Sequence, residues 1–153
     1  MNGVEGRTIW VDADAAPKPV KEILFRAAIR LKLPVILVAN QPLLIPNSNY
    51  VEARVVGKGF DVADDYIVEQ VKAGDLVITA DIPLAAQVVE KGALVIDPRG
   101  DVIDATNARI RLAARDRAEQ MREAGMMTGG PKPYGDKEKR SFAGALDRWL
   151  ARR

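Results

Sequence analysis

The chain has 153 residues, 48% of them hydrophobic and 29% charged, a composition that fits a globular protein and excludes a mainly disordered one. It contains no cysteine and no histidine, which excludes disulfides, zinc fingers, cysteine nucleophiles and histidine-based acid–base catalysis. The net charge of +2 combines −3 over residues 1–97 (10 Lys and Arg, 13 Asp and Glu) with +5 over residues 98–153 (13 against 8).

The first two thirds of the chain alternate between short apolar runs and segments with helical spacing of apolar residues. Pro17 and Pro19 stand where the first helix should begin, and Gly92 follows the third. The Pro-, Asn- and Ser-rich residues 40–49 indicate a loop. The apolar runs predict five strands, at residues 8–11, 35–38, 53–56, 76–79 and 94–96. The helical spacing predicts three helices, at residues 17–31, from residue 61 to a stop at Gly74, and at residues 83–91.

The composition changes after Gly100. Residues 107–123 are Arg-rich and amphipathic, residues 128–131 form a Gly- and Pro-containing break, and residues 136–150 predict a final helix. The β-α-β alternation before this point predicts a mainly parallel sheet with helices on both faces. We therefore expect one α/β domain over residues 1–153, with residues 101–153 as a helical extension packed on it.

Polar side chains follow four of the five predicted strands. They are Asp12, Asn40, Asp81 and Asp97, and Asp14 lies two residues beyond the first of them. Ligands of open α/β sheets bind outside the carboxyl ends of the strands, where the strand order reverses. If the first strand lies beside the fourth, Asp12 and Asp81 meet at that point. The acids that begin the helix leading into the fourth strand can lean over the same crevice; they are Asp64 and Asp65.

Several carboxylates in one place repel each other, and a bound Mg²⁺ or Mn²⁺ relieves that repulsion. Such an ion lowers the pKa of a bound water and stabilises negative charge on a phosphate, so this chemistry needs no histidine. The competing interpretation is capping or turning. Asp61 is a plausible helix N-cap with Asp64 as the acid of a capping box, and Asp97 precedes Pro98 in a turn. Taken together, Asp12, Asp14 and Asp81 favour the metal site.

Basic and polar residues near the predicted crevice are candidates for binding substrate. They are Lys18, Lys58, Arg99, Asn40 and Thr79. Three arginines of the C-terminal part could also hold backbone phosphates; they are Arg109, Arg111 and Arg115. Each basic residue taken alone is more often a solvated surface charge. Aromatic residues make up only 5% of the chain, which argues against sequence-specific recognition of single strands by stacking.

Six segments carry a resemblance to a known family: residues 9–17 (IWVDADAAP), 38–41 (VANQ), 59–65 (GFDVADD), 75–85 (DLVITADIPLA), 97–100 (DPRG) and 128–131 (TGGP). They cover nearly the whole chain, and together they resemble the bacterial YaiI/YqxD family, also called UPF0178 or DUF188. That family is similar to PIN and NYN nuclease-like domains. Relatives have a cysteine where this chain has Ala16, a change that removes no oxygen ligand.

The resemblance implies a three-layer α/β/α fold with a mainly parallel five-stranded sheet in the order 3-2-1-4-5, followed by C-terminal helices. It also implies a Mg²⁺- or Mn²⁺-dependent ribonuclease. Asp12 matches the acid of the first strand, Asp81 matches the acid after the fourth, and Asp64 or Asp65 matches the acid on the intervening helix. Asp14 and Asp97 match less closely. The predicted catalytic acids are Asp12, Asp64, Asp65 and Asp81, and the predicted metal ligands are Asp12, Asp14, Asp65 and Asp81.

Two other functions are compatible with the sequence. One is a phosphohydrolase of the haloacid-dehalogenase type, since Asp12 and Asp14 have its spacing, although that pattern requires Thr where Ala16 stands. The other is a non-catalytic binding module that keeps the fold. A polar N-terminus and the absence of any apolar run of roughly 18–20 residues lead us to expect a cytoplasmic protein without membrane association. RNA and a second copy of the chain are the partners we consider, and we expect no zinc.

Overall fold

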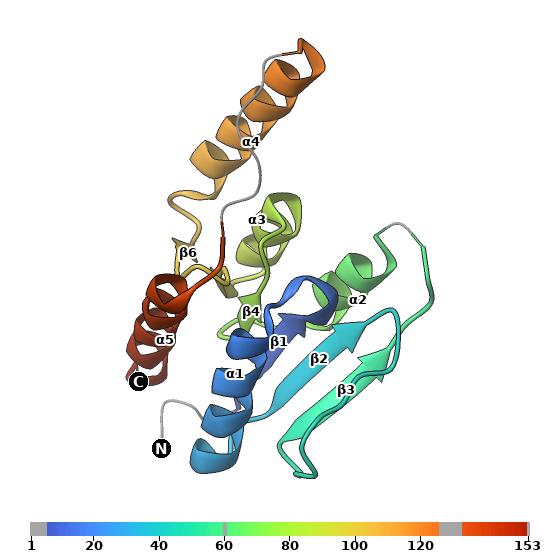
Figure 1. Cartoon of the computed structure of the whole chain (residues 1–153), viewed down its shortest axis with the longest axis vertical. Helices are drawn as coiled ribbons and strands as arrows, with labels where there is room; N and C mark the ends of the chain where they lie inside the picture. The colour runs from blue at the N-terminus through green and yellow to red at the C-terminus, as the bar shows by residue number, and fades with distance from the viewer. Residues whose placement is uncertain (1–5, 60, 126–132, 153) are drawn as a thin grey trace.

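The computed structural model describes residues 6–59, 61–125 and 133–152, and its centre is a six-stranded sheet in the order β3-β2-β1-β4-β5-β6 (Figure 1). The strands are β1 (Ile9–Asp12), β2 (Val35–Ala39), β3 (Val51–Val55), β4 (Leu76–Ile78), β5 (Leu94–Ile96) and β6 (Val102–Ile103). The first five pair in parallel, and β6 is antiparallel to β5. The prediction of five strands was therefore wrong in number, because the two-residue β6 is too short to show a periodicity.

Five α-helices and one 3₁₀ turn surround the sheet in the described part of the chain. They are η1 (Ala13–Ala15), α1 (Lys18–Leu31), α2 (Val62–Gln70), α3 (Ile82–Glu90), α4 (Ala108–Glu123) and α5 (Asp136–Leu150). All five α-helices begin within one residue of the predicted positions, but α2 ends at Gln70, ahead of the stop predicted at Gly74. Proline and glycine explain the agreement for α1 and α3, since Pro17 precedes α1, Pro83 lies in the first turn of α3, and Gly92 follows α3 with φ +92°.

The strands bury both faces, and successive residues of a strand face opposite sides of the sheet. On β1, Ile9 and Val11 join the hydrophobic core that includes α1 and α5. Trp10 faces the other side and joins the core that includes α2 and α3. Helices thus cover both faces of the sheet, and each fully buried large side chain contributes about 1.5–3 kcal/mol through its removal from water.

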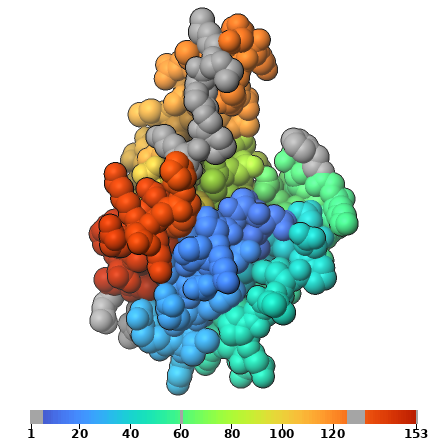
Figure 2. Space-filling model, viewed as in Figure 1, coloured from blue at the N-terminus to red at the C-terminus, as the bar shows by residue number. Residues whose placement is uncertain are grey.

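The two C-terminal helices differ in how they contact the rest of the chain. Phe142, Leu146 and Trp149 of α5 are buried in the same core as α1, and Figure 2 shows α5 in red beside α1 in blue. In α4 only Ala108 is buried, and Ile110 is 70% exposed. Figure 1 shows α4 projecting beyond the sheet. The extension therefore contributes to the core through α5, while α4 contacts α3 near its own first turn.

The tight turn between β5 and β6 is held by a carboxylate and fitted against α5. Asp97 Oδ1 accepts hydrogen bonds from the backbone N–H groups of Arg99 at 2.8 Å and Asp101 at 3.0 Å. Gly100 has φ +95°, and a Cβ there would lie 2.4 Å from Ser141 Oγ and 2.6 Å from its carbonyl carbon. Only glycine fits this close approach, so the turn and α5 have one fixed relative position.

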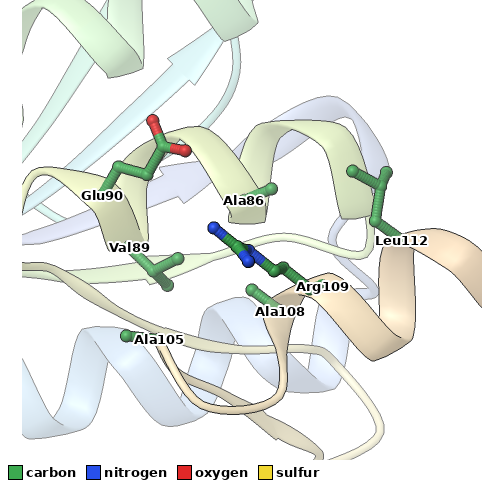
Figure 3. A pocket seen from close by; sticks show the side chains of 7 residues that line it. All are labelled: Ala86, Val89, Glu90, Ala105, Ala108, Arg109 and Leu112. Carbon is green, nitrogen blue, oxygen red and sulfur yellow. The ribbon is translucent and has the colours of Figure 1, made fainter.

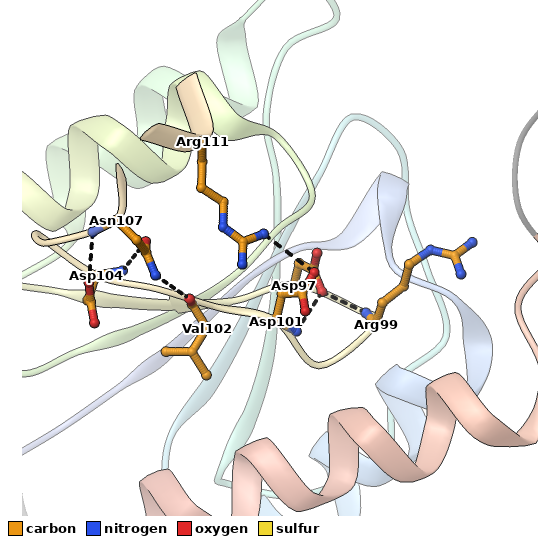
Figure 4. A network of polar contacts seen from close by, with 7 residues as sticks. All are labelled: Asp97, Arg99, Asp101, Val102, Asp104, Asn107 and Arg111. Carbon is orange, nitrogen blue, oxygen red and sulfur yellow. Dashed lines mark hydrogen bonds and ion pairs between the residues drawn. The ribbon is translucent and has the colours of Figure 1, made fainter. Parts of the chain in front are cut away.

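A polar network continues from this turn to the start of α4 (Figure 4). Asn107 Nδ2 donates to the carbonyl oxygen of Val102 at 3.0 Å, and Asp104 Oδ1 accepts from the backbone N–H of Asn107 at 3.1 Å. Arg111 forms an ion pair with Asp101 at 3.4 Å. These contacts fix the connection between β6 and α4.

A search of the described residues for membrane-spanning helices finds none with the length and apolar character that a bilayer requires.

Candidate active site

The pairing of β1 with β4 brings two of the predicted acids to one edge of the sheet. Ile9, Trp10 and Val11 pair with Leu76, Val77 and Ile78, so Asp12 lies beside the residues that follow β4. Thr79 Oγ1 donates a hydrogen bond to Asp12 Oδ2 at 3.0 Å and accepts one from the backbone N–H of Asp81 at 3.0 Å. Thr79 is only 1% exposed, so these two hydrogen bonds are shielded from water and fix the positions of Asp12 and of the backbone of Asp81.

Asp81 has a structural role in addition to its place beside Asp12. It is the N-cap of α3, and its Oδ1 accepts a hydrogen bond from the backbone N–H of Leu84 at 3.0 Å. Asp64, in the first turn of α2, lies within hydrogen-bonding reach of this side chain when one of the two carboxyl groups is protonated. The capping and metal-site interpretations of Asp81 are thus compatible, because a carboxylate has two oxygens and several lone pairs.

The carboxyl groups of Asp12 and Asp64 have raised pKa values. Burial is the largest cause of the rise in the pKa of Asp64 to about 7, followed by the charge of Asp81, the hydrogen bond with Asp81, and the charges of Asp12 and Asp61. Burial also raises the pKa of Asp12, with smaller contributions from Asp81 and Asp14, against the opposing effect of its bond to Thr79. In the described residues, no ion pair involves any of these acids. A proton therefore relieves part of the repulsion.

A hollow of about 230 Å³ opens beside these acids. Its lining comes from the ends of β1 and β2 and the start of α2: Asp12, Asp14, Ala15, Asn40, Gly59, Asp61, Val62, Ala63 and Asp64. Asp64, half-buried, lies in this lining, whereas the neighbouring Asp65 is exposed and does not. Of the two acids that the sequence left open for the helix position, the structure brings Asp64 to the site.

Asn40 and Asp14 hold the rim of this hollow together. Asp14 Oδ2 accepts a hydrogen bond from the backbone N–H of Asn40 at 2.9 Å, and Asn40 Nδ2 donates to the carbonyl oxygen of Gly57 at 3.1 Å. The loop of Gly57, Lys58 and Gly59 is thereby tied to the end of β2. Lys58 itself is exposed within that loop, next to Gly59 of the lining.

Sequence reasoning missed Asp61 as a member of the site. We predicted it as an N-cap in a capping box with Asp64, but its side chain makes no capping hydrogen bond and its backbone is left-handed, with φ +64°. That conformation, which Asp tolerates better than most residues, turns the chain at the edge of the hollow. No spacing in the sequence distinguishes such an acid from an ordinary cap. The capping-box prediction was therefore wrong.

The remaining predicted residues lie outside the hollow. Lys18 is exposed at the start of α1, and Asp97 and Arg99 line a separate hollow beside Tyr134. Arg115 forms an ion pair with Glu119 at 2.9 Å, and exposed pairs of this kind contribute up to about 1 kcal/mol. The segment of residues 128–131 and Phe60 lie outside the described residues.

Arg109 borders a further hollow, of about 350 Å³, between α3 and α4 (Figure 3). The Arg109 guanidinium is directed toward α3. The walls are mostly small or apolar, and the lining residues are Ala86, Val89, Glu90, Ala105, Ala108, Arg109 and Leu112. It holds one carboxylate and none of the predicted acids. This hollow is larger than the one beside Asp12, but it lacks groups suited to metal or proton chemistry.

The acids have the right chemistry for a hard cation, but the described side chains do not surround a common point. Among residues 6–59, 61–125 and 133–152, no group of three or more carboxylates is arranged to hold a metal ion. The side chains of Asp64 and Asp81 instead lie close to each other, and Asp81 raises the pKa of Asp64. All the donors are oxygen atoms, which Mg²⁺ and Mn²⁺ prefer.

A model of one protein family matches residues 10–152, and its description is "Uncharacterized BCR, YaiI/YqxD family" (DUF188). The chain belongs to the YaiI/YqxD family. Among curated members of this family, the UPF0178 proteins of Shewanella sp. (strain MR-4) and Saccharophagus degradans are each 58% identical over 144 residues. These matches cover 94% of this chain and 96% and 95% of the two relatives.

A UPF0178 protein of Legionella pneumophila (strain Lens) is 58% identical over 145 residues, which is 95% of this chain and 98% of that protein. No solved structure matches the chain. Because the YaiI/YqxD family is described as uncharacterised, its name assigns no reaction. The function has to be argued from the acids themselves.

The pH dependence of stability tests the burial and charge repulsion at Asp64. Because its folded-state pKa of about 7 lies above the ordinary value of 3.8 for an aspartate, its protonated form stabilises the fold fully below pH 3.8, and this contribution is lost as the pH rises through 7. Asp64→Asn removes the charge, so we expect it to raise the free energy of unfolding by roughly 1–2 kcal/mol at pH 8, an amount reduced for partial solvent screening, and by almost nothing at pH 4.

Urea denaturation at the two pH values measures this difference. The exposed neighbour Asp65→Asn is the matched control and should change stability little at either pH. Equal effects of Asp64→Asn at pH 4 and pH 8 would contradict the proposed repulsion.

Proposed function

We propose that this chain is a Mg²⁺- or Mn²⁺-dependent phosphodiester hydrolase that acts on RNA. The observation that carries the proposal is the proximity of Asp12, Asp64 and Asp81, which come from three separate segments of the chain; the charges of Asp81 and Asp12 both raise the pKa of Asp64. Their charges are not neutralised by a basic partner among the described residues, and the pKa of Asp64 rises to about 7. Repelling carboxylates of this kind are suited to sharing a divalent cation.

Each acid has a distinct part in this proposal. Asp12, Asp14 and Asp81 would hold the cation, which supplies a bound water of lowered pKa and stabilises negative charge on the phosphate. Asp64 would move the proton, because it lines the hollow and is not one of the three acids that hold the cation. We leave out Asp65, since it is exposed and, unlike Asp81, is not among the charges that raise the pKa of Asp12 or Asp64.

Neighbouring residues keep the acids in place. Thr79 orients Asp12 through its hydroxyl and holds the backbone of Asp81, while the backbone of Asn40 orients Asp14. The hydrogen bond between Asp64 and Asp81 partly offsets the repulsion that a cation would relieve. Binding of the cation should therefore displace a proton and separate these two side chains.

The relationship to PIN and NYN nuclease-like domains is part of the proposal. One support is the strand order β3-β2-β1-β4-β5, which five of the six strands follow. Another is the presence of acids at the ends of β1 and β4 and on α2, the helix that precedes β4. RNA as substrate follows from this relationship. Lys58 beside the hollow supplies a positive charge for the phosphate backbone.

Incubation of the wild-type protein with an end-labelled single-stranded RNA tests the proposal. We expect cleavage with Mn²⁺ or Mg²⁺ and none with EDTA. A phosphate monoester should remain intact under the same conditions. Monoester hydrolysis without RNA cleavage would replace the proposal with the haloacid-dehalogenase alternative, and the absence of turnover on both substrates with either metal would contradict catalysis by this site.

A further inference from the structure

A second hollow adjoins the aspartate hollow and shares Ala15 with it. It has a volume of about 200 Å³ and is formed where η1, the end of β4, the β5–β6 turn and the approach to α5 meet: Ala15, Pro17, Ala80, Asp97, Pro98, Arg99 and Tyr134. Ala80 lies in the chain between Thr79 and Asp81. The second hollow therefore begins directly beside the acids, and it extends toward α1 and α5.

Independent contacts hold the walls of this second hollow. The Tyr134 hydroxyl donates a hydrogen bond to the carbonyl oxygen of Pro98 at 2.8 Å, and Arg99 Nη1 donates to the carbonyl oxygen of Pro133 at 3.2 Å. Gly100 fits closely against Ser141 of α5, which fixes the turn that carries Arg99. A hollow held in this way needs little rearrangement to bind a ligand, which favours affinity.

The walls offer an aromatic ring and a guanidinium, and Oδ1 of their one carboxylate, Asp97, is occupied by two backbone N–H groups, so a planar, negatively charged ligand suits them best. Tyr134 supplies an aromatic ring, and the Arg99 guanidinium carbon lies 5.9 Å from the centroid of that ring. Figure 4 shows the Arg99 guanidinium directed away from Asp97 and Asp101. Ala15, Pro17 and Ala80 leave apolar space beside these two groups. Aromatic rings stack on nucleobases of any sequence, and guanidinium groups bind phosphates.

We infer that this hollow is a nucleotide subsite for single-stranded RNA, which holds the nucleotide next to the phosphate at the acids. Its base packs on Tyr134, and its phosphate faces Arg99. The inference rests on the proposed function, because it takes the aspartate hollow as the place of cleavage. It also gives the single aromatic ring of this wall a role that composition alone did not indicate.

The groove between α1 and α5 continues the path of the strand. It is a further hollow of about 350 Å³, lined by Ile23, Arg26, Asp136, Lys139, Arg140 and Ala143, with three basic groups against one acid. Ile23 lies six residues beyond Pro17, about 9 Å along the axis of α1. Figure 2 shows α1 and α5 side by side on this face. Phosphates that leave the subsite therefore meet positive charge.

Fluorescence anisotropy of a labelled single-stranded RNA in EDTA measures binding without turnover. We expect Tyr134→Leu to weaken binding by about fivefold or more without changing its salt dependence, since stacking is lost and no charge is removed. Arg99→Gln should weaken binding and reduce the slope of log affinity against log salt by about 0.7, as for one lost phosphate contact. Lys72→Gln, which removes one exposed positive charge before β4, at the end of the sheet away from both hollows, is the charge control and should change neither quantity.

Tyr134→Phe separates stacking from folding, because it keeps the ring and removes the hydroxyl that bonds to Pro98. We expect it to retain most of the affinity that Tyr134→Leu loses, with a smaller loss from the missing hydrogen bond. Wild-type protein that fails to bind RNA, or Tyr134→Leu and Arg99→Gln variants that bind like the wild type, would overturn the subsite. RNA binding that depends on Tyr134 and Arg99 in a protein that never cleaves RNA would support the subsite and contradict only the proposed hydrolysis.

Discussion

Asp81→Asn is expected to lower the rate of Mn²⁺-dependent RNA cleavage at least about a hundredfold. Asparagine is as good an N-cap as aspartate, so its side-chain oxygen can still accept from the backbone N–H of Leu84 and α3 should keep its start. The substitution removes only the negative charge and one strong metal-ligand oxygen. A loss of rate can therefore be assigned to the chemistry of the site.

Initial rates of cleavage at saturating Mn²⁺ measure this effect, with Asp65→Asn as the control that removes a charge from exposed surface on α2. Thermal denaturation should show that Asp81→Asn is at least as stable as the wild type, because the repulsion with Asp64 is relieved. Cleavage by Asp81→Asn at the wild-type rate would show that the reaction takes place elsewhere.

Asp75→Ala is expected to lower the free energy of unfolding by about 3–5 kcal/mol. Asp75 precedes β4 at the opposite end from Asp81 and is only 4% exposed. Its carboxylate accepts hydrogen bonds from the backbone N–H of Thr8 at 3.0 Å, the indole Nε1–H of Trp10 at 3.1 Å and the backbone N–H of Lys72 at 3.0 Å. Alanine leaves these three donors without their acceptor in a site from which water is largely excluded.

Urea denaturation of Asp75→Ala and Asp75→Asn measures this cost. Asparagine keeps one carbonyl oxygen, so we expect it to be intermediate in stability between alanine and the wild type. Folded Asp75→Asn should retain RNA cleavage, since this residue precedes β4, at the end of the strand opposite to the acids. A loss below about 1 kcal/mol in Asp75→Ala would mean that water satisfies the three donors.

The prediction of the elements succeeded where local physics decides the conformation. Apolar periodicity is local and predicted all five helices, and Pro17, Pro83 and Gly92 bound α1 and α3. The short β6 depends on a turn held by Asp97, and Asp75 depends on a partner 65 positions away in Trp10. Neither contact leaves a periodic signal in the sequence.

The candidate site shows the same division. Acids at strand ends could be placed at one edge because parallel strands end together, and Asp12 and Asp81 do lie there. The choice between Asp64 and Asp65 required the rotation of α2, which spacing alone does not give. Asp61 reaches its hollow through a left-handed turn, and Tyr134 reaches its own through the packing of α5 and its hydrogen bond to Pro98. Both positions are set by tertiary packing.

The buried hydroxyl group of Thr79 has an evolutionary consequence. It serves a side chain on β1 and the backbone at the start of α3 at the same time. A lineage that replaced it with an apolar residue would release Asp12 and the α3 entrance together, in a place that water does not reach. Divergence of substrate among related chains is therefore easier at the outer walls, such as those of Arg99 and Tyr134, than at this shared support.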